Sequence, residues 1–271
     1  QAEDPNRACM PCHAERVRRA PEHTHHPKES PGSRCISCHM PMTEFARRRR
    51  SDHSMLPPTP AATRVYESPN ACNLCHTDRD AAWADAQVRA WHDNDFQAPV
   101  LVRAGLIQAA RERNWESLPD MIAYLRDPDR DEIYAASLIR LLMPCRNPAA
   151  ETLFRESLAD PSPLVRSAAA AALGGWPSRK SWDALLQAVE DPYRLVRIRA
   201  AAALAAFPQP SKTSRKKESL ERATQEYLSS LRSRPDHWAS HYNLGNYYMD
   251  IRKEEEARKA YETALGLDPG N

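Results

Sequence analysis

Three copies of one short motif constrain this chain more than any other feature. The segments CMPCH, CISCH and CNLCH occupy residues 9–13, 35–39 and 72–76 and use six of the seven cysteines. In Cys-x-x-Cys-His the two thiols bond to a porphyrin, and the histidine that follows them ligates the iron. The sequence therefore predicts three covalently bound haem c groups (iron). Their attachment residues would be Cys9, Cys12, Cys35, Cys38, Cys72 and Cys75, with His13, His39 and His76 as proximal iron ligands.

Two other uses of cysteine pairs compete with haem attachment. Paired Cys-x-x-Cys units can build a structural zinc site, but zinc leaves the third pair without a partner and does not explain a histidine after every pair. Disulfides are the second alternative, although such closely spaced pairs form redox sites more often than structural cross-links. The seventh cysteine, Cys145, lies in the apolar stretch SLIRLLMPC and is expected to be a buried thiol.

Composition divides the chain into two parts. Residues 1–70 are rich in Pro, His, Arg and Ser, so this segment cannot bury a core of its own. We expect residues 1–95 to form an irregular triple-haem domain with little regular structure, wrapped around cofactors that supply the missing apolar mass. From about residue 96, a 3.6-residue period in Ala, Leu and Arg predicts helices. The expected fold class is therefore all-α, with an α-solenoid after the haem domain.

The helical part is repetitive. LADPSPLVRSAAAAAL begins at Leu158 and VEDPYRLVRIRAAAAL begins at Val189, which gives a period of 31 residues. A weaker copy, LRDPDRDEIYAASLIRLL, precedes them. In each copy Asp-Pro is expected to end one helix and to start the turn to the next. Residues 96–208 thus resemble HEAT repeats, whose helix pairs stack into a solenoid.

A linker over residues 209–217 separates the HEAT-like part from a different repeat. A helix expected over residues 218–232 fits either the second helix of an incomplete first repeat or a simple cap. One and a half repeats make a poor solenoid, so residues 218–271 are expected either to dock on the HEAT segment or to belong to a longer array. Residues 238–271 resemble a tetratricopeptide repeat at the signature positions Leu244, Gly245, Tyr248, Ala257, Tyr261, Ala264 and Pro269.

The supply of histidines favours two histidine ligands on each iron. The chain has ten histidines, and a six-coordinate haem iron needs a distal ligand besides the proximal one. The HTHH cluster lies in a Pro-rich loop, where neighbouring histidines can point in opposite directions and reach two irons. The predicted distal ligands are His25, His26 and His53, with His23 in reserve. Weaker candidates are His92, Met40 and Met42, whereas His237 and His241 fall in the tetratricopeptide segment.

The order of these segments resembles one family. HTHHPKESPGSRCISCHMP, then RRSDHS, then SPNACNLCHTD with a Trp-containing helix are similar to bacterial multihaem cytochromes c that carry HEAT and tetratricopeptide repeats after the haem domain. The resemblance implies that His25, His26 and His53 are iron ligands. Relatives commonly carry further haem motifs upstream, whereas eight residues precede Cys9 here. That difference implies a fragment, a processed form or a reduced variant.

Charge and haem chemistry bear on partners and location. The formal net charge of +2 gives no reason to expect nucleic acid or a membrane surface as a partner. No apolar run is long enough to span a membrane. Because bacteria attach haem c outside the cytoplasmic membrane, we expect an exported protein, periplasmic or extracellular. A basic run would bind haem propionates or steer an acidic redox partner, and consists of Arg47, Arg48, Arg49 and Arg50.

The expected function is the transfer of single electrons through closely packed bis-histidine haems. The helical repeats would dock redox partner proteins, other multihaem cytochromes or further copies of the chain, and a histidine of the 23–26 loop would ligate or abut a haem across that boundary. The alternative is a subunit of a multihaem oxidoreductase for nitrogen or sulfur oxyanions, which needs an iron with an open position; a scaffold is a third. We favour an electron carrier without catalytic residues, because histidines outnumber the vacant positions and no Cys-x-x-Cys-Lys variant occurs.

Overall fold

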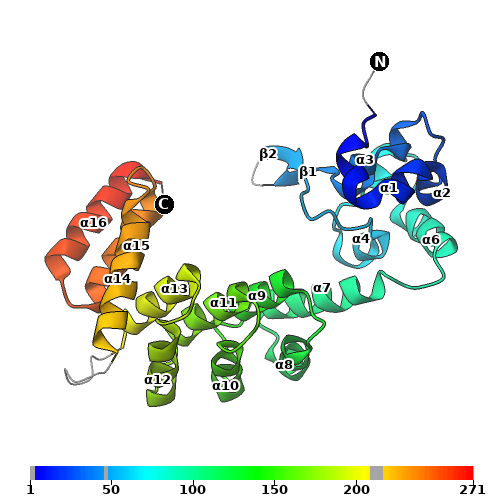
Figure 1. The fold of residues 1–271 in the computed structure, drawn as a ribbon. Coiled ribbons are helices and arrows are strands. Elements are labelled where there is room, and N and C mark those ends of the chain that lie inside the picture. The colour runs from blue at the N-terminus through cyan, green and yellow to red at the C-terminus, as the bar shows by residue number, and fades with distance from the viewer. Residues whose placement is uncertain (1–3, 46–47, 208–215, 271) are drawn as a thin grey trace. The chain divides into compact units, whose positions relative to one another are not determined.

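The computed structural model describes residues 4–45, 48–207 and 216–270. The chain divides into two compact units, Gln1–Ala104 and Gly105–Asn271, each with its own internal contacts. Both units are built mainly of helices, and the described residues contain one short β-hairpin (Figure 1).

In the first unit each Cys-x-x-Cys-His motif forms or borders a short helix. The first motif enters α1 (Met10–Arg18), the second forms α3 (Cys35–His39), and the third forms α5 (Cys72–Cys75) with His76 directly after it. Regular structure is thus more abundant in this segment than the sequence predicted. The other helical elements are the 3-10 turns Arg7–Cys9 and Pro31–Ser33 and the helices α2 (Ala20–Thr24), α4 (Pro60–Tyr66) and α6 (Ala81–Trp91), followed by α7 (Ala98–Arg111).

The hairpin is the one departure from the all-α expectation in the described residues. Strands β1 (Met42–Phe45) and β2 (Arg48–Ser51) pair antiparallel, with Glu44 opposite Arg49. Opposite charges that face each other across two strands favour pairing. The sequence did not predict a strand for the arginine run, of which Arg48, Arg49 and Arg50 lie on β2.

Few apolar side chains are buried among the described residues of the first unit, and they are small. Val17 and Val88 are the largest, and the others are alanines such as Ala61 and Ala84. Alanine and valine remove little area from water, so this core contributes little hydrophobic free energy. The burial pattern agrees with the expectation that this segment has no sizeable core of its own.

A buried polar network ties α6 to α4 and to the chain before α7. Asp85 is 3% exposed and accepts hydrogen bonds from Arg64 at 2.7 Å, from Arg89 at 3.0 Å and from Gln97 at 2.8 Å. Gln97 in turn accepts a bond from the backbone N–H of Ala61 at 2.9 Å. Burial acts to raise the pKa of Asp85, but the hydrogen bonds from Arg64 and Gln97 outweigh it and lower that pKa. Asp85 therefore acts as a paired carboxylate that fixes the position of α6.

The second unit begins with three stacked helix pairs. In Figure 1 the first helices of the pairs form one row and the second helices form another. Neighbouring second helices pack on each other, α9 on α11 and α11 on α13. This arrangement confirms the expected helical repeats. The pairs are α8 (Leu118–Arg126) with α9 (Glu132–Leu141), α10 (Pro148–Ser157) with α11 (Pro163–Leu173), and α12 (Arg179–Ala188) with α13 (Arg194–Ala205).

Each Asp-Pro dipeptide lies in the turn between two helices, as the repeat predicted. The carboxylates of Asp127, Asp160 and Asp191 each accept a hydrogen bond from the backbone N–H two residues further on, at 2.9, 2.8 and 2.8 Å. Such side-chain-to-backbone bonds stabilise a turn, and the proline cannot continue the preceding helix. The Asp-Pro pair therefore both ends the first helix and shapes the connection.

A continuous apolar core runs through the stacked pairs. Ala168, Ala169 and Ala170 on α11 are buried, and their small side chains let the neighbouring helices approach closely. Cys145 is fully buried among these residues, which confirms its expected role as a small hydrophobe. The large side chains at the centre of this core are Met121, Leu138, Ile139, Phe154 and Leu173.

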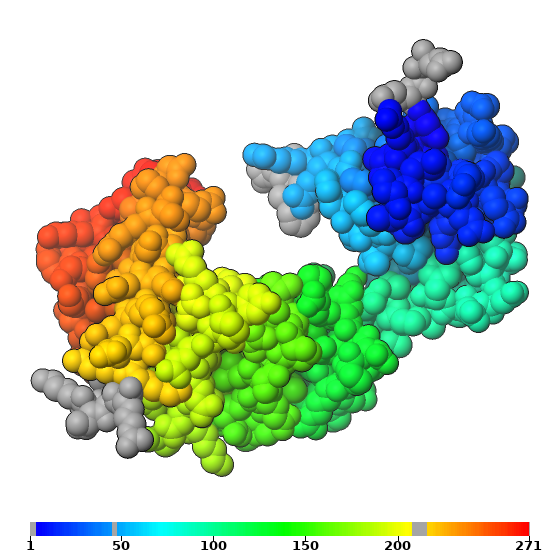
Figure 2. Space-filling model, in the orientation of Figure 1, coloured from blue at the N-terminus to red at the C-terminus, as the bar shows by residue number. Residues whose placement is uncertain are grey.

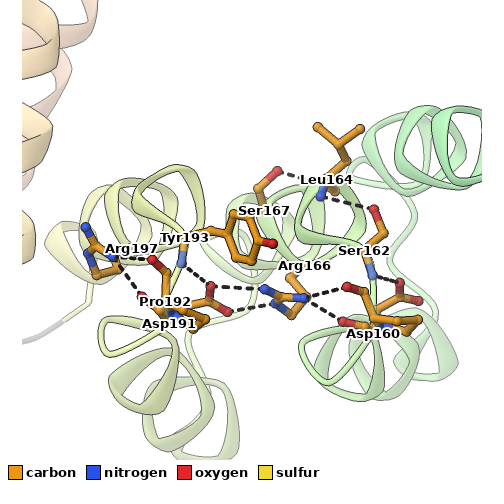
Figure 3. A network of polar contacts seen from close by, with 10 residues as sticks. Asp160, Ser162, Leu164, Arg166, Ser167, Asp191, Pro192, Tyr193 and Arg197 are labelled. Carbon is orange, nitrogen blue, oxygen red and sulfur yellow. Dashed lines mark hydrogen bonds and ion pairs between the residues drawn. The ribbon is translucent and has the colours of Figure 1, made fainter.

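A ladder of ion pairs joins one repeat to the next. Arg166 donates to both carboxylate oxygens of Asp191, at 2.7 and 3.1 Å, and to the carbonyl oxygens of Asp160 and Pro161, at 2.8 and 3.0 Å (Figure 3). Its guanidinium also lies over the ring of Tyr193, 5.4 Å from the ring centre. One side chain thus binds the turn of its own repeat and the turn of the following repeat. Arg197 repeats this pattern one repeat later, with the carbonyl oxygens of Asp191 and Pro192 and the carboxylate of Glu226. One repeat earlier, Arg130 pairs with Asp160.

The ion pair Arg197–Glu226, the last of the ladder, attaches α14 (Lys217–Arg232) to the repeats. Glu226 of α14 accepts bonds from Arg197 at 2.8 and 2.9 Å, and Ala223 is fully buried. Of the two arrangements expected for the last segment, docking on the HEAT-like pairs is the one observed.

Helices α15 (Trp238–Asp250) and α16 (Glu254–Leu267) form the final pair. They meet at Gly245, where an added Cβ would overlap the ring of Tyr261, and the Tyr261 hydroxyl donates to Asn246 at 2.8 Å. This close approach explains why glycine and tyrosine stand at these two signature positions.

The ladder predicts a large stability cost for Arg166→Ala. Arg166 is 9% exposed, and its removal leaves the buried Asp191 carboxylate without its cation. Loss of one partner of a buried pair costs about 3 kcal/mol. The matched control is Arg179→Ala, whose pair with Asp183 is exposed and contributes about 0.5 kcal/mol. Urea unfolding followed by circular dichroism measures both, and equal effects would show that the ladder does not join the repeats.

Two glycines on the last pair predict opposite effects of alanine. Gly245→Ala must displace Tyr261 and should lower the free energy of unfolding by about 1–3 kcal/mol through overpacking. Gly266→Ala meets no atom within 4 Å, so it should be neutral or stabilise the helix by about 0.5–1 kcal/mol. Thermal unfolding of the two variants tests the contact, and an unchanged midpoint for Gly245→Ala would contradict it.

Candidate functional site

The first unit brings the thiols of different motifs together. Burial and the neighbouring thiols of Cys72 and Cys75 raise the pKa of Cys38 to about 11. Burial and a hydrogen-bonded neighbour, Cys9, raise the pKa of Cys35. All seven cysteines are free thiols, so the disulfide alternative is not realised in this structure. Motifs far apart in the sequence therefore lie next to one another in the first unit.

The histidine loop sends its side chains in three directions. Helix α2 ends at Thr24, and His25 caps it in the left-handed conformation, with φ 56° and ψ 28°. Residues other than glycine adopt this conformation rarely. It turns the chain sharply between His23 and His26, so that each of the three histidines has a different ring neighbour. Those neighbours are His39 for His23, Trp91 for His25 and His76 for His26.

Two of these contacts are pairs with motif histidines. The ring centres of His23 and His39 are 6.2 Å apart with an interplanar angle of 4°, and those of His26 and His76 are 5.9 Å apart at 43°. Metal–imidazole bonds are about 2 Å long, so two imidazoles on opposite sides of one metal ion have ring centres roughly 6 Å apart. Aromatic pairs without a metal also reach this separation. The informative point is that both partners are the histidines directly after Cys-x-x-Cys pairs.

Backbone carbonyls hold three histidine rings through Nδ1. His39 donates to the carbonyl oxygen of Met55 at 3.3 Å, His26 to that of Thr24 at 2.5 Å, and His53 to that of Ser51 at 2.8 Å. Metal-ligating histidines usually donate their second ring N–H in this way, which fixes the tautomer and leaves Nε2 as the ligand atom. The hydrogen bonds therefore prepare His26, His39 and His53 to bind a metal through Nε2.

His23 has a different neighbour at Nδ1. Arg16 donates to this atom at 3.2 Å, which places the proton of a neutral ring on Nε2. Burial, then Arg16 and His39, lower the pKa of His23 and favour the neutral ring. To bind iron through Nε2, His23 must move its proton to Nδ1, and Arg16 must turn away. Arg16 is exposed, so it can do so at little cost.

The fit of His26 depends on a glycine. A Cβ added at Gly32 would overlap the His26 ring, so only glycine lets the ring lie against the backbone there. Gly32 belongs to the 3-10 turn Pro31–Ser33, which directly precedes the second motif. The turn therefore helps to place the histidine loop against the motifs.

The remaining ligand candidates are not paired with motif histidines. His25 stacks on Trp91 with ring centres 4.2 Å apart, His92 contacts Phe96, and His53 is exposed beside the hairpin. Among the ring contacts of the described residues, none involves His13. Among these loop histidines, His23 and His26 are therefore the two that lie beside motif histidines.

Other predicted residues have simpler settings. Met40 follows α3, and the sulfur of Met42 accepts a hydrogen bond from Ser51 at 3.3 Å. His241 bonds the carbonyl oxygen of Pro235, and His237 lies against Trp238, both in the second unit. Of the arginine run, Arg48, Arg49 and Arg50 are exposed on β2, which projects from the first unit (Figure 2), and Arg47 lies outside the described residues.

The described ranges 4–45, 48–207 and 216–270 contain neither a group of side chains that could hold a zinc ion nor a helix that could span a membrane. No group of three or more His, Cys, Asp or Glu side chains is placed to hold a metal ion, as a structural zinc site requires. A haem iron takes only two protein ligands, so it does not need such a group. No helix there combines the length and apolar character needed to cross a membrane.

Comparison with known proteins identifies the repeats and leaves the first unit unmatched. No curated protein and no solved structure matches the chain. Residues 150–233 match the HEAT repeats family, and residues 239–271 match the tetratricopeptide repeat family. The HEAT match includes α14, which the sequence had grouped with the tetratricopeptide segment, and it begins after the α8–α9 pair. Residues 150–233 and 239–271 therefore carry HEAT and tetratricopeptide repeats, respectively.

Proposed function

We propose that this chain is a multihaem c-type cytochrome that transfers single electrons through haems held in its first unit. The observation that carries the proposal is the coincidence of two independent features. Three Cys-x-x-Cys-His motifs occur in the sequence, and two of their histidines face loop histidines at a separation that suits two ligands on one iron. Bound haem supplies a one-electron iron couple.

The chain's own residues have distinct roles in this proposal. The six motif cysteines anchor the porphyrins. His39 with His23, and His76 with His26, would hold two of the irons, and His13 would bind the iron at the first motif. The carbonyl oxygens that accept from His39 and His26 fix the ring orientation. The small alanine core of this unit supports the proposal, because covalently held haems would supply the apolar mass that the side chains lack.

One observation favours the alternative, an oxidoreductase subunit. In the part of the chain that the structure describes, His13 has no histidine ring beside it, in contrast to His39 and His76. An iron with one protein ligand has a position for substrate, which oxyanion reduction needs. The electron carrier remains the favoured function because both other motifs have paired histidines. His53, exposed and with Nδ1 already bonded, is available as the missing ligand.

The repeats give the proposal its partners. HEAT and tetratricopeptide repeats have no chemistry of their own and present broad surfaces for protein binding. We propose that they dock a redox partner protein, another multihaem cytochrome or a second copy of the chain. Haem c attachment would place the protein outside the cytoplasmic membrane, in the periplasm or beyond it.

Intact mass spectrometry tests haem attachment directly. The denatured protein should weigh its polypeptide plus three haem groups, because thioether bonds survive unfolding. The double variant Cys35→Ser, Cys38→Ser should carry two haems, since the other motifs are untouched. A mass equal to the bare polypeptide, or zinc in place of iron by elemental analysis, would end the proposal.

Single histidine variants test the axial pairs. His23→Ala and His26→Ala should each convert about one third of the haem from low-spin to high-spin iron, because each removes one distal ligand. His25→Ala is the matched control from the same loop, and it should leave the spin state unchanged because His25 stacks on Trp91. The visible spectrum of the ferric protein reports the outcome. Conversion by His25→Ala but not by His23→Ala would reverse the assignment.

A further inference from the structure

A tryptophan lies against the histidine of the third motif. The rings of His76 and Trp83 have centres 4.9 Å apart and planes inclined by 51°. In the described residues no hydrogen bond reaches the His76 ring, in contrast to His26 and His39, whose Nδ1 atoms bind backbone carbonyls. Ring packing is therefore the contact that orients His76.

Trp83 itself is held in place by the start of α6. The side chain of Asp80 caps this helix and accepts a bond from the backbone N–H of Trp83 at 2.8 Å. The guanidinium of Arg79 lies over the indole, 6.0 Å from the ring centre. Two residues further along α6, the Asp85 network anchors this helix to the rest of the unit. The indole is thus a fixed surface rather than a mobile neighbour.

The segment between His76 and Trp83 is also clamped. Asn73 donates to the carbonyl oxygen of Arg79 at 2.8 Å, and the backbone N–H of Arg79 donates to the carbonyl oxygen of His76 at 3.2 Å. Asn70 accepts from the backbone N–H of Asn73 at 3.2 Å and donates to its side chain at 2.9 Å. These bonds fix the conformation of the segment between the third motif and α6, and so hold Trp83 beside the His76 ring.

We propose that Trp83 is a positioning residue that sets the plane of the His76 imidazole and thereby the 43° angle between His76 and its partner His26. The inference rests on the proposed function, in which these two histidines are the axial ligands of one iron. The other pair, His23 with His39, has nearly parallel planes at 4° and no indole against its motif histidine among the described ring contacts. The two sites therefore differ in one defined way.

Electron paramagnetic resonance of the ferric protein measures this angle. For low-spin iron with two imidazole ligands, the largest g value rises as the ligand planes turn from parallel towards perpendicular. The untreated protein should show separate signals for the two pairs, with the larger g value from His26–His76. The signal lost in His26→Ala identifies that pair.

All variants are measured in the full, haem-containing protein. Trp83→Leu should shift the largest g value of the His26–His76 signal and leave the His23–His39 signal unchanged. Trp83→Phe keeps an aromatic face but a smaller ring, so it should shift the same g value in the same direction and by less. Trp91→Leu, at the indole that stacks on His25, is the matched control and should move neither signal.

Each outcome decides the inference. If Trp83→Leu carries three haems and all g values are unchanged, Trp83 does not orient His76. If Trp83→Leu loses haem, the g value of Trp83→Phe decides. A shifted His26–His76 signal in that variant supports positioning, whereas an unshifted signal shows that the indole only stabilises the fold. A parent protein without haem refutes the proposed function as well, which separates the two failures.

Discussion

The separation between paired histidine rings is the geometric constraint on which the proposed haem sites of the first unit depend. Two rings separated by roughly 6 Å can share one metal ion, and the fold creates this gap twice, at His23–His39 and at His26–His76. Both gaps follow from one backbone event, the left-handed conformation of His25, which sends successive histidines towards different motifs. A loop of four residues thereby serves two sites, and the thiols of the three motifs gather around the same cluster.

The two units are stabilised by different means. In the second unit large apolar side chains fill a continuous core, and buried ion pairs link neighbouring repeats, with a bidentate contact at Arg166–Asp191. The first unit buries mainly alanines and relies on polar networks such as the one around Asp85. A segment of that composition gains stability from any large apolar group bonded to it. In the proposed function covalent haem would be that group, and cofactor attachment and folding would then be coupled there.

Periodic features were predictable from the sequence, and orientations were not. The Asp-Pro turns, the helix pairs, the buried Cys145 and the close approach at Gly245 all follow from spacing and residue size. The placement of His23 beside His39 and of His25 beside Trp91 does not, because it depends on the left-handed φ angle of His25, which no sequence pattern indicates. The β-hairpin was missed because its arginine run lacks apolar alternation. The docking of α14 on α13 was left open because tetratricopeptide and HEAT helices share the same apolar period.

Anomalous diffraction at the iron absorption edge tests the central claim most directly, because it locates each iron without reference to spectra or activity. We expect three iron peaks in the first unit, one between His23 and His39, one between His26 and His76, and one beside His13. Iron bonded to His25 in place of His23, or a zinc edge at the cysteine pairs with no iron signal, would contradict the account.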